Sequence, residues 1–202
     1  MLDDRVRAVL RQLEEENVRE EADGQLPVND RSLAISPTTG ALLFALCAGH
    51  AGCEVLEIGG SRGYSTLWLG AAARMFGGHV TSLEADAAKL GHSARNIADA
   101  GLSEWVEILP GDAFVTLKGL DGPFDVVFID AWKDDYEALF AVVRSKVEPG
   151  AVVIADNVLS HEGTLGAYSR ARQADPGLVS VTVPLDSGLE VSSVLTDWLL
   201  SG

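Results

Sequence analysis

Short apolar runs alternate along this chain with longer stretches of helical character. The apolar runs lie at residues 53–58, 79–84, 105–109, 124–129 and 151–155. The last two are apolar at almost every position, as expected for strands that are buried on both faces of a sheet. Strands that alternate with helices indicate βαβ units. The chain is therefore predicted to be an α/β protein with a doubly wound, mostly parallel sheet and helices on both faces.

The C-terminal part of the chain predicts an end to the parallel pattern. A short helical region near residues 163–174 is followed by two β-rich stretches, at 179–185 and 189–195. Between them lies Asp186-Ser187-Gly188, a polar turn with glycine that is typical of a hairpin. The sheet is therefore predicted to have seven strands and to close with an antiparallel pair.

The N-terminal part predicts a helix and a loop ahead of the sheet. Residues 3–22 carry a stripe of apolar residues at helical spacing, which predicts a surface helix: Val6, Val9, Leu10, Leu13 and Val18. The acidic run 14–16 is interpreted as its solvated face. Residues 24–37 are rich in turn formers and predict a loop that could cover a site as a lid, and a helix follows to Ala48. One domain is expected over 1–202, with 1–37 as helix and lid-like loop and 38–202 as core.

Length, charge and cysteine content narrow the classes of function. A chain of 202 residues supports one cored domain, so ligand sites must share a single fold. The formal net charge of -15 repels phosphate backbones and anionic headgroups, so neither nucleic acid nor a membrane is an expected partner. Cys47 and Cys53 are interpreted as small buried hydrophobes rather than a disulfide. The N-terminus has no apolar signal-type core, and a cytoplasmic location is expected.

Candidate binding residues follow three successive predicted strands. Ligands of open α/β sheets bind beyond the carboxyl ends of the strands. The first strand leads from Glu57 into a glycine-rich turn at residues 59–65, where the backbone can approach a ligand. The second ends at Glu84, which could accept hydrogen bonds from ribose hydroxyls or simply favour a helix N-terminus. After the third, Asp112 could meet a base edge or cap a helix.

The next two strands deliver oxygen ligands to the same edge. Asp130 follows the fourth strand, and Asp156 and Asn157 follow the fifth. Two carboxylates and one amide oxygen suit Mg²⁺, and would also accept Mn²⁺ or Ca²⁺. The alternative is structural: Asp130 would pair with Lys133, and Asp156 or Asn157 would cap a helix. We favour the metal site because it accounts for three oxygen ligands at once.

The strand-end residues together resemble the class I methyltransferases that bind S-adenosylmethionine (SAM). The resemblance rests on Glu57-x-Gly59 with Gly63, then Glu84, then Asp112. It implies a Rossmann-like fold, with Glu57, Gly59, Tyr64 and Ser65 at the methionine part, Glu84 at the ribose and Asp112 with Ala113 at the adenine. The implied cofactor-binding set also contains Gly60, Gly63, Ala85, Asp130 and Trp132.

Within this class the chain resembles the metal-dependent O-methyltransferases that act on catechols and on caffeoyl-coenzyme A. The similarity spans residues 35–191, and Asp-x-Trp-Lys-Asp-x-Tyr at 130–136 is closer to the catechol branch. The resemblance implies a metal held by Asp130, Asp156 and Asn157, with Lys133 as general base. It also implies that Lys133, Asn157 and Glu190 contact a substrate with two adjacent hydroxyls, and that Trp132 lines the pocket.

The expected function is thus SAM-dependent and metal-dependent O-methyl transfer to a small phenolic substrate. A nicotinamide-dependent oxidoreductase would share the glycine turn and the acid after the second strand, but it would leave the cluster of oxygen ligands unexplained. A non-catalytic SAM-binding protein is the third alternative. The sequence does not identify the phenol, and it is compatible with a homodimer.

Overall fold

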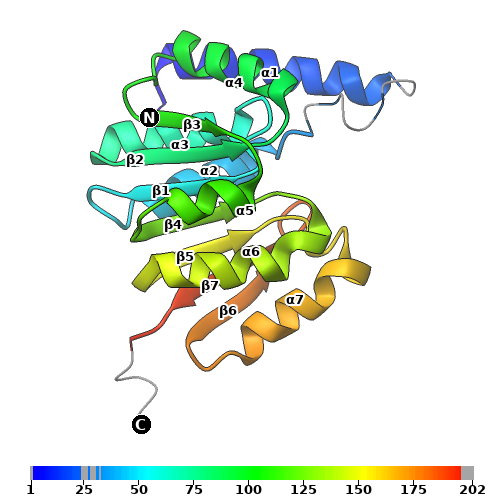
Figure 1. The fold of residues 1–202 in the computed structure, drawn as a ribbon. Helices are drawn as coiled ribbons and strands as arrows, with labels where there is room; N and C mark the ends of the chain where they lie inside the picture. Colours follow the sequence, from blue (N-terminus) through cyan, green and yellow to red (C-terminus); the bar gives the residue numbers. More distant parts are fainter. Residues whose placement is uncertain (1, 24–26, 28–30, 32, 197–202) are drawn as a thin grey trace.

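The computed structural model describes residues 2–23, 27, 31 and 33–196. The strands of this part of the chain form one seven-stranded sheet in the order β3-β2-β1-β4-β5-β7-β6 (Figure 1). The strands are β1 (Glu54–Ile58), β2 (His79–Glu84), β3 (Val106–Pro110), β4 (Phe124–Ile129), β5 (Val147–Ala155), β6 (Leu178–Val183) and β7 (Leu189–Val194). The first five strands pair in parallel, and β7 is antiparallel to both neighbours. The predicted doubly wound sheet with a closing hairpin is confirmed.

Helices cover both faces of the sheet, as the pattern predicts (Figure 1). They are α1 (Asp4–Ala22), α2 (Pro37–Cys47), α3 (Tyr64–Phe76), α4 (Ala87–Asp99), α5 (Ala113–Thr116), α6 (Tyr136–Val143) and α7 (Glu162–Ala174), with 3-10 turns at 117–119, 133–135 and 144–146. One core lies between the sheet and α1 to α4, and a second lies between the sheet and α6 and α7. Alternate strand residues supply the two cores: Val126 and Phe128 face the first, Val127 and Ile129 the second.

Helix α1 docks through a shorter apolar stripe than the sequence suggested. Val6, Val9, Leu10 and Leu13 are buried, whereas Val18 is 65% exposed. The prediction that Val18 belongs to the docking stripe is therefore wrong. The stripe ends at Leu13, and the following turns of the helix make polar contacts that the apolar pattern does not reveal.

Strand β5 begins earlier than predicted. It starts at Val147 rather than near Ala151. The sequence Glu148-Pro149-Gly150 is typical of a turn, but here it continues the strand with an irregular register against β4.

Cys47 and Cys53 are both free and fully buried, as expected. None of the helices within the described residues is long and apolar enough to span a membrane. Much of the lid-like loop lies outside the described residues.

The strand order reverses between β1 and β4, where the chain turns from one half of the sheet to the other. The backbone N–H of Asp130 donates to Ile58 O at 2.9 Å, and that of Asp156 donates to Ile129 O at 3.0 Å. These two bonds extend the ladder by one residue beyond β4 and β5. Asp130 and Asp156 therefore stand at the carboxyl edge of the sheet, beside the switch point where open α/β folds bind ligands.

Candidate active site

The glycine turn (residues 59–65) is pressed against the ends of two neighbouring strands. The N–H groups of Gly59 and Gly60 both donate to Leu83 O, at 2.9 and 3.1 Å. Gly59 has a φ of 100°, and a Cβ there would lie only 2.0 Å from Asp130 O. Only glycine permits this approach. The turn that follows β1 and the residues that follow β4 are thus in direct contact.

Glu57 lies beneath the glycine turn and is completely buried. Its Oε2 accepts hydrogen bonds from Thr66 Oγ1 and Ser82 Oγ, whereas Oε1 has no hydrogen-bond partner among the described residues. Burial raises the pKa of this carboxyl group, and the hydroxyl groups of Ser65, Ser82 and Thr66 partly oppose that rise. A buried carboxylate oxygen without a donor is costly, so it marks a position where a polar or cationic group of a ligand fits.

Glu84 connects the turns after β1 and β2. Its Oε2 accepts from the N–H of Ser61 at 2.6 Å, and its Oε1 accepts from the N–H of Asp86 at 2.7 Å. Each oxygen keeps lone-pair capacity for further donors. Asp112 caps α5 by accepting from the N–H of Val115 at 3.1 Å, which is the capping role considered for it. Ala85 and Ala113 follow β2 and β3 at the same edge.

Asp130 is paired with a lysine three residues further on. Lys133 Nζ lies 2.8 Å from Asp130 Oδ1 and 3.2 Å from the hydroxyl of Tyr136. The side chains of Lys133 and Asp130 are 21% and 20% exposed, so the pair is partly shielded from water. Tyr136 is buried, and burial together with the charges of Asp130 and Asp156 raises the pKa of its phenol. The neutral phenol therefore accepts the hydrogen bond from the ammonium group.

Asp156 and Asn157, the other two residues predicted to hold a metal, follow β5 at the same edge of the sheet. Asp156 is 3% exposed, and its Oδ1 accepts from Ser187 Oγ at 2.9 Å and from the N–H of Asn157 at 2.7 Å. Burial and the neighbouring charge of Asp130 raise the pKa of Asp156 to about 6. Asn157 has a φ of 65°, a left-handed conformation that asparagine tolerates. Ser187, which the sequence did not single out, comes from the β6–β7 turn.

Trp132, a candidate for the cofactor site and the pocket wall, and Glu190, a candidate substrate contact, lie in contrasting surroundings. Trp132 is 72% exposed at the edge that carries the other candidates. Glu190 is only 1% exposed, and its carboxylate accepts hydrogen bonds from Gln173 Nε2, Ser180 Oγ and Thr182 Oγ1. These donors join α7 and β6 to β7. The predicted contacts of Trp132 and Glu190 with a substrate stay predictions.

The acidic run of α1 is not a simple solvated face. Glu14 Oε1 accepts a hydrogen bond from the Tyr64 hydroxyl at 2.7 Å, and Glu20 pairs with Arg62. Both partners belong to the glycine turn. The sequence held no local signal for these contacts, because Glu14 lies 50 positions from Tyr64. The solvated-face interpretation holds for Glu15, whose side chain is 73% exposed, and is wrong for Glu14.

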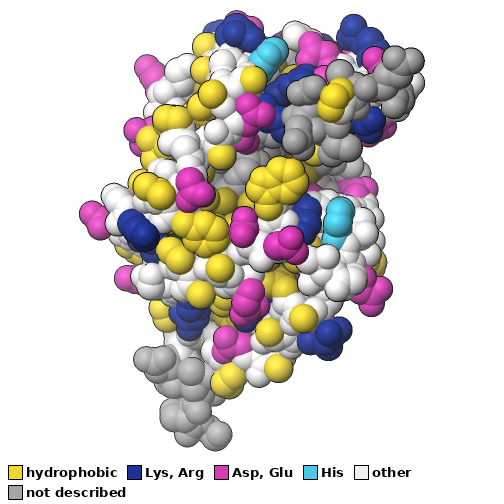
Figure 2. Space-filling model, turned by 45° about the vertical axis from the view of Figure 1, so that its right-hand side comes forward, with side chains coloured by type: hydrophobic (Ala, Val, Ile, Leu, Met, Phe, Trp, Pro, Cys, Tyr) yellow, Lys and Arg dark blue, Asp and Glu magenta, His cyan; other side chains and the backbone are white. Residues whose placement is uncertain are grey.

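The arrangement as a whole defines an α/β protein with a candidate polar ligand site at the carboxyl edge. The buried Glu57, the glycine turn, Asp130 and Asp156 lie near the switch point. Within the described ranges, no group of three or more His, Cys, Asp or Glu side chains is placed to hold a metal ion; the candidate set has two carboxylates and one amide. Acidic side chains are spread among apolar and basic ones over the face shown in Figure 2, in keeping with the net charge of -15.

Comparison with known proteins identifies the family. Residues 56–158, half of the chain, match the family model described as a methyltransferase domain. A catechol O-methyltransferase of Mycobacterium tuberculosis is 37% identical over 134 residues, which cover 66% of this chain and 60% of the relative. One of Niastella koreensis is 36% identical over 132 residues, covering 63% and 59%. An O-methyltransferase from Bacillus cereus in complex with SAH has a TM-score of 0.77 at 28% identity, covering 93% and 90%.

The chain therefore belongs to the methyltransferase family. The resemblance to O-methyltransferases, closer to the catechol branch, is confirmed. The alternative of a nicotinamide-dependent oxidoreductase is therefore wrong. The sequence matches span about 60% of the length of these two curated relatives. The match to the family model, at residues 56–158, includes the glycine turn and Asp130, Asp156 and Asn157.

Proposed function

We propose that this protein transfers a methyl group from SAM to a hydroxyl of a small catechol-type phenol, with one divalent metal ion holding the acceptor. The observation that carries the proposal is the contact between two sites. The glycine turn expected to bind the cofactor lies against Asp130, which is expected to bind the metal. A methyl donor and a metal-held acceptor would therefore meet at one place, as in-line transfer requires.

The cofactor residues fit SAM. The partnerless Oε1 of Glu57 suits the ammonium group of the methionine part, and Glu84 has acceptor capacity for ribose hydroxyls. The match to the SAH-bound structure from Bacillus cereus supports the same ligand. When bound, SAM supplies a methyl group on a sulfonium, which is already an activated electrophile. The tasks left to the protein are to position the acceptor hydroxyl and to remove its proton.

The donor set after β4 and β5 fits a hard divalent cation. Asp130, Asp156 and Asn157 would hold it, and Mg²⁺ is the ion we propose, with Mn²⁺ or Ca²⁺ as alternatives. Burial and the charge of Asp130 raise the pKa of Asp156, and a cation between the two carboxylates would offset both effects. When bound, the cation would lower the pKa of a coordinated hydroxyl and fix its position.

Lys133 is the residue we propose as the proton acceptor. Its Nζ lies at the site between Asp130 and the buried Tyr136 hydroxyl, which limits the positions it can reach. As a neutral amine it would take the hydroxyl proton. Asn157 would contact the acceptor. We propose the same for Glu190, whose four hydrogen bonds already occupy about four lone-pair sites, so a substrate hydroxyl would have to displace one of these donors.

The direct test is methyl transfer from labelled SAM to a panel of small catechols, with Mg²⁺ and with EDTA. We expect transfer with Mg²⁺ that EDTA abolishes. Transfer that persists in EDTA would contradict the metal role and leave methyl transfer standing. SAH binding by calorimetry without transfer to any member of the panel would favour the non-catalytic alternative.

A further inference from the structure

The glycine turn is held from outside by the N-terminal helix. Among the contacts that the described residues make with the turn are those of four side chains: Glu84 accepts from the N–H of Ser61, Asn96 donates to Arg62 O at 2.8 Å, and the remaining two, Glu14 and Glu20, come from α1. Glu84 and Asn96 hydrogen-bond to the backbone of the turn. The two α1 carboxylates instead contact its side chains, Tyr64 and Arg62.

Both α1 contacts are well shielded from solvent. Tyr64 is 5% exposed, and burial together with Glu14 raises the pKa of its hydroxyl, which therefore stays a donor. The side chains of Arg62 and Glu20 are 18% and 15% exposed. Charge-assisted hydrogen bonds at such sites are stronger than those in open water, so each contact helps to fix the position of its partner in the turn.

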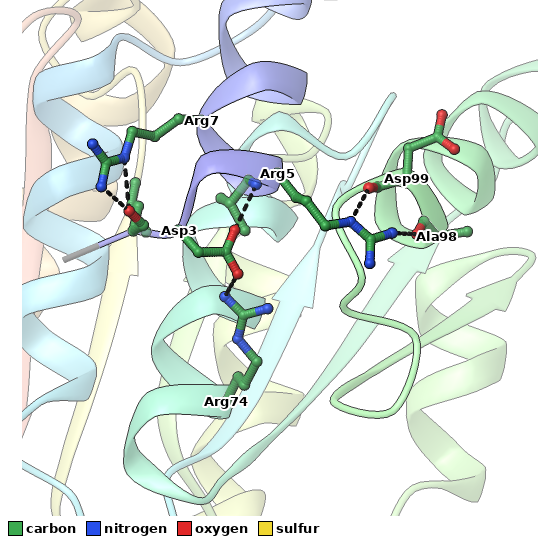
Figure 3. Close-up of polar contacts among 8 residues, drawn as sticks. Asp3, Arg5, Arg7, Arg74, Ala98 and Asp99 are labelled. Carbon is green, nitrogen blue, oxygen red and sulfur yellow. Dashed lines mark hydrogen bonds and ion pairs between the residues drawn. The ribbon is translucent and has the colours of Figure 1, made fainter.

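Helix α1 is anchored independently at its other end (Figure 3). Asp3, just before the helix, lies 2.6 Å from Arg74 of α3, and Arg5 donates to the carbonyls of Asp99 and Ala98 at 3.1 and 3.2 Å. The helix then runs along the sheet, so that its C-terminal half reaches the carboxyl edge (Figure 1). A helix fixed at its start can position the groups near its end.

We infer that Glu14 and Glu20 are positioning residues that hold the glycine turn in its SAM-binding shape. The inference rests on the proposed function, because it assigns SAM to the turn. Among the described residues, Glu14 contacts Tyr64 and Glu20 contacts Arg62, and these two carboxylates are the positioning groups. They act through Tyr64 and Arg62, and their loss should weaken cofactor binding without altering how the phenol binds.

The test compares Glu14→Gln, Glu20→Gln and the double variant with Glu15→Gln as control. The control removes the same charge from the same helix, but Glu15 is exposed and pairs with Arg19 one turn away. Calorimetry with SAH gives the dissociation constant, and kinetics give KM for SAM and for the phenol. We expect each single variant to bind SAH about three- to tenfold more weakly, with the larger loss in the double variant. The KM for the phenol and the affinity of the control should stay unchanged.

The outcomes separate this inference from the proposed function. Wild-type protein that binds no SAH overturns both. If the wild-type protein and all four variants bind SAH with equal affinity, the inference alone is overturned. A loss of affinity in Glu15→Gln as large as that in Glu14→Gln or Glu20→Gln would show a general charge effect and also overturns it. A rise in KM for both substrates would indicate loosened folding and also overturns it. Urea unfolding of each variant shows whether the variant is folded under the conditions of the binding and kinetic measurements.

Discussion

Glu57 at the carboxyl edge is a residue whose proposed binding role conflicts with stability. Its carboxylate is buried with one oxygen lacking a partner among the described residues. Because burial raises its pKa, the folded state favours the protonated form. Below the pKa that Glu57 has in the unfolded chain, this group does not lower the free energy of unfolding. As the pH rises from that pKa toward the higher pKa of the folded state, the group increasingly destabilises the fold.

Glu57→Gln should therefore raise the melting temperature at neutral pH and change it little at pH near 4. The same variant should bind SAH roughly tenfold more weakly, because a neutral amide replaces the carboxylate at the proposed ammonium site. Melting curves across pH and calorimetry with SAH check the two halves. A lower melting temperature at neutral pH together with unchanged SAH affinity would contradict this role of Glu57.

At the scale of elements, the β6–β7 turn supports the candidate metal site. Gly188 has a φ of 86°, and a Cβ there would lie 2.4 Å from Leu159 Cγ. Its neighbour Ser187 donates to Asp156. Gly188→Ala should destabilise the protein by about 1–3 kcal/mol, through backbone strain and overpacking. Urea unfolding measures this, with Gly163→Ala in α7 as control, because nothing lies within 4 Å of a Cβ at Gly163. Equal stability of both variants would contradict the tight packing of the turn.

The sequence predicted most elements and few of the contacts between them. Buried strands and the hairpin turn leave local patterns, so β4 and β7 were predictable. Contacts such as Glu14 with Tyr64 join positions far apart in the chain and leave no periodic signal. Strand β5 was predicted too short because Pro149-Gly150 is a local pattern typical of a turn. In the structure these two residues lie within the strand, where pairing in the sheet determines their conformation.

For the candidate site, the sequence predicted which residues follow the strands at the carboxyl edge, but not how their side chains are arranged. Parallel strands bring their carboxyl ends to one edge, so the strand pattern by itself predicts that Glu57, Asp130 and Asp156 lie near one another. The site also depends on directions of side chains that a strand pattern does not determine. Glu190 was placed by resemblance alone, and the structure buries its carboxylate among donors from α7 and β6.

The whole molecule carries a net charge of -15, and its parts should repel one another at low ionic strength. Raising the salt from about 0.05 M to about 0.5 M NaCl should therefore stabilise the fold. We expect of order 1 kcal/mol, which corresponds to about 2–4 °C in melting temperature for a chain of this size. Thermal melts in EDTA exclude metal binding as the cause. A melting temperature that falls with salt would show that attractive ion pairs outweigh the net repulsion.

The most direct test of the proposed mechanism compares Asp156→Ala with the wild-type protein for both SAH binding and methyl transfer. Asp156 is expected to hold the metal, and Glu57 and the glycine turn are expected to hold the cofactor. The variant should therefore bind SAH within about twofold of wild type and lose Mg²⁺-dependent transfer to catechols by at least about 100-fold. Transfer at the wild-type rate by Asp156→Ala would contradict the proposed metal-dependent mechanism.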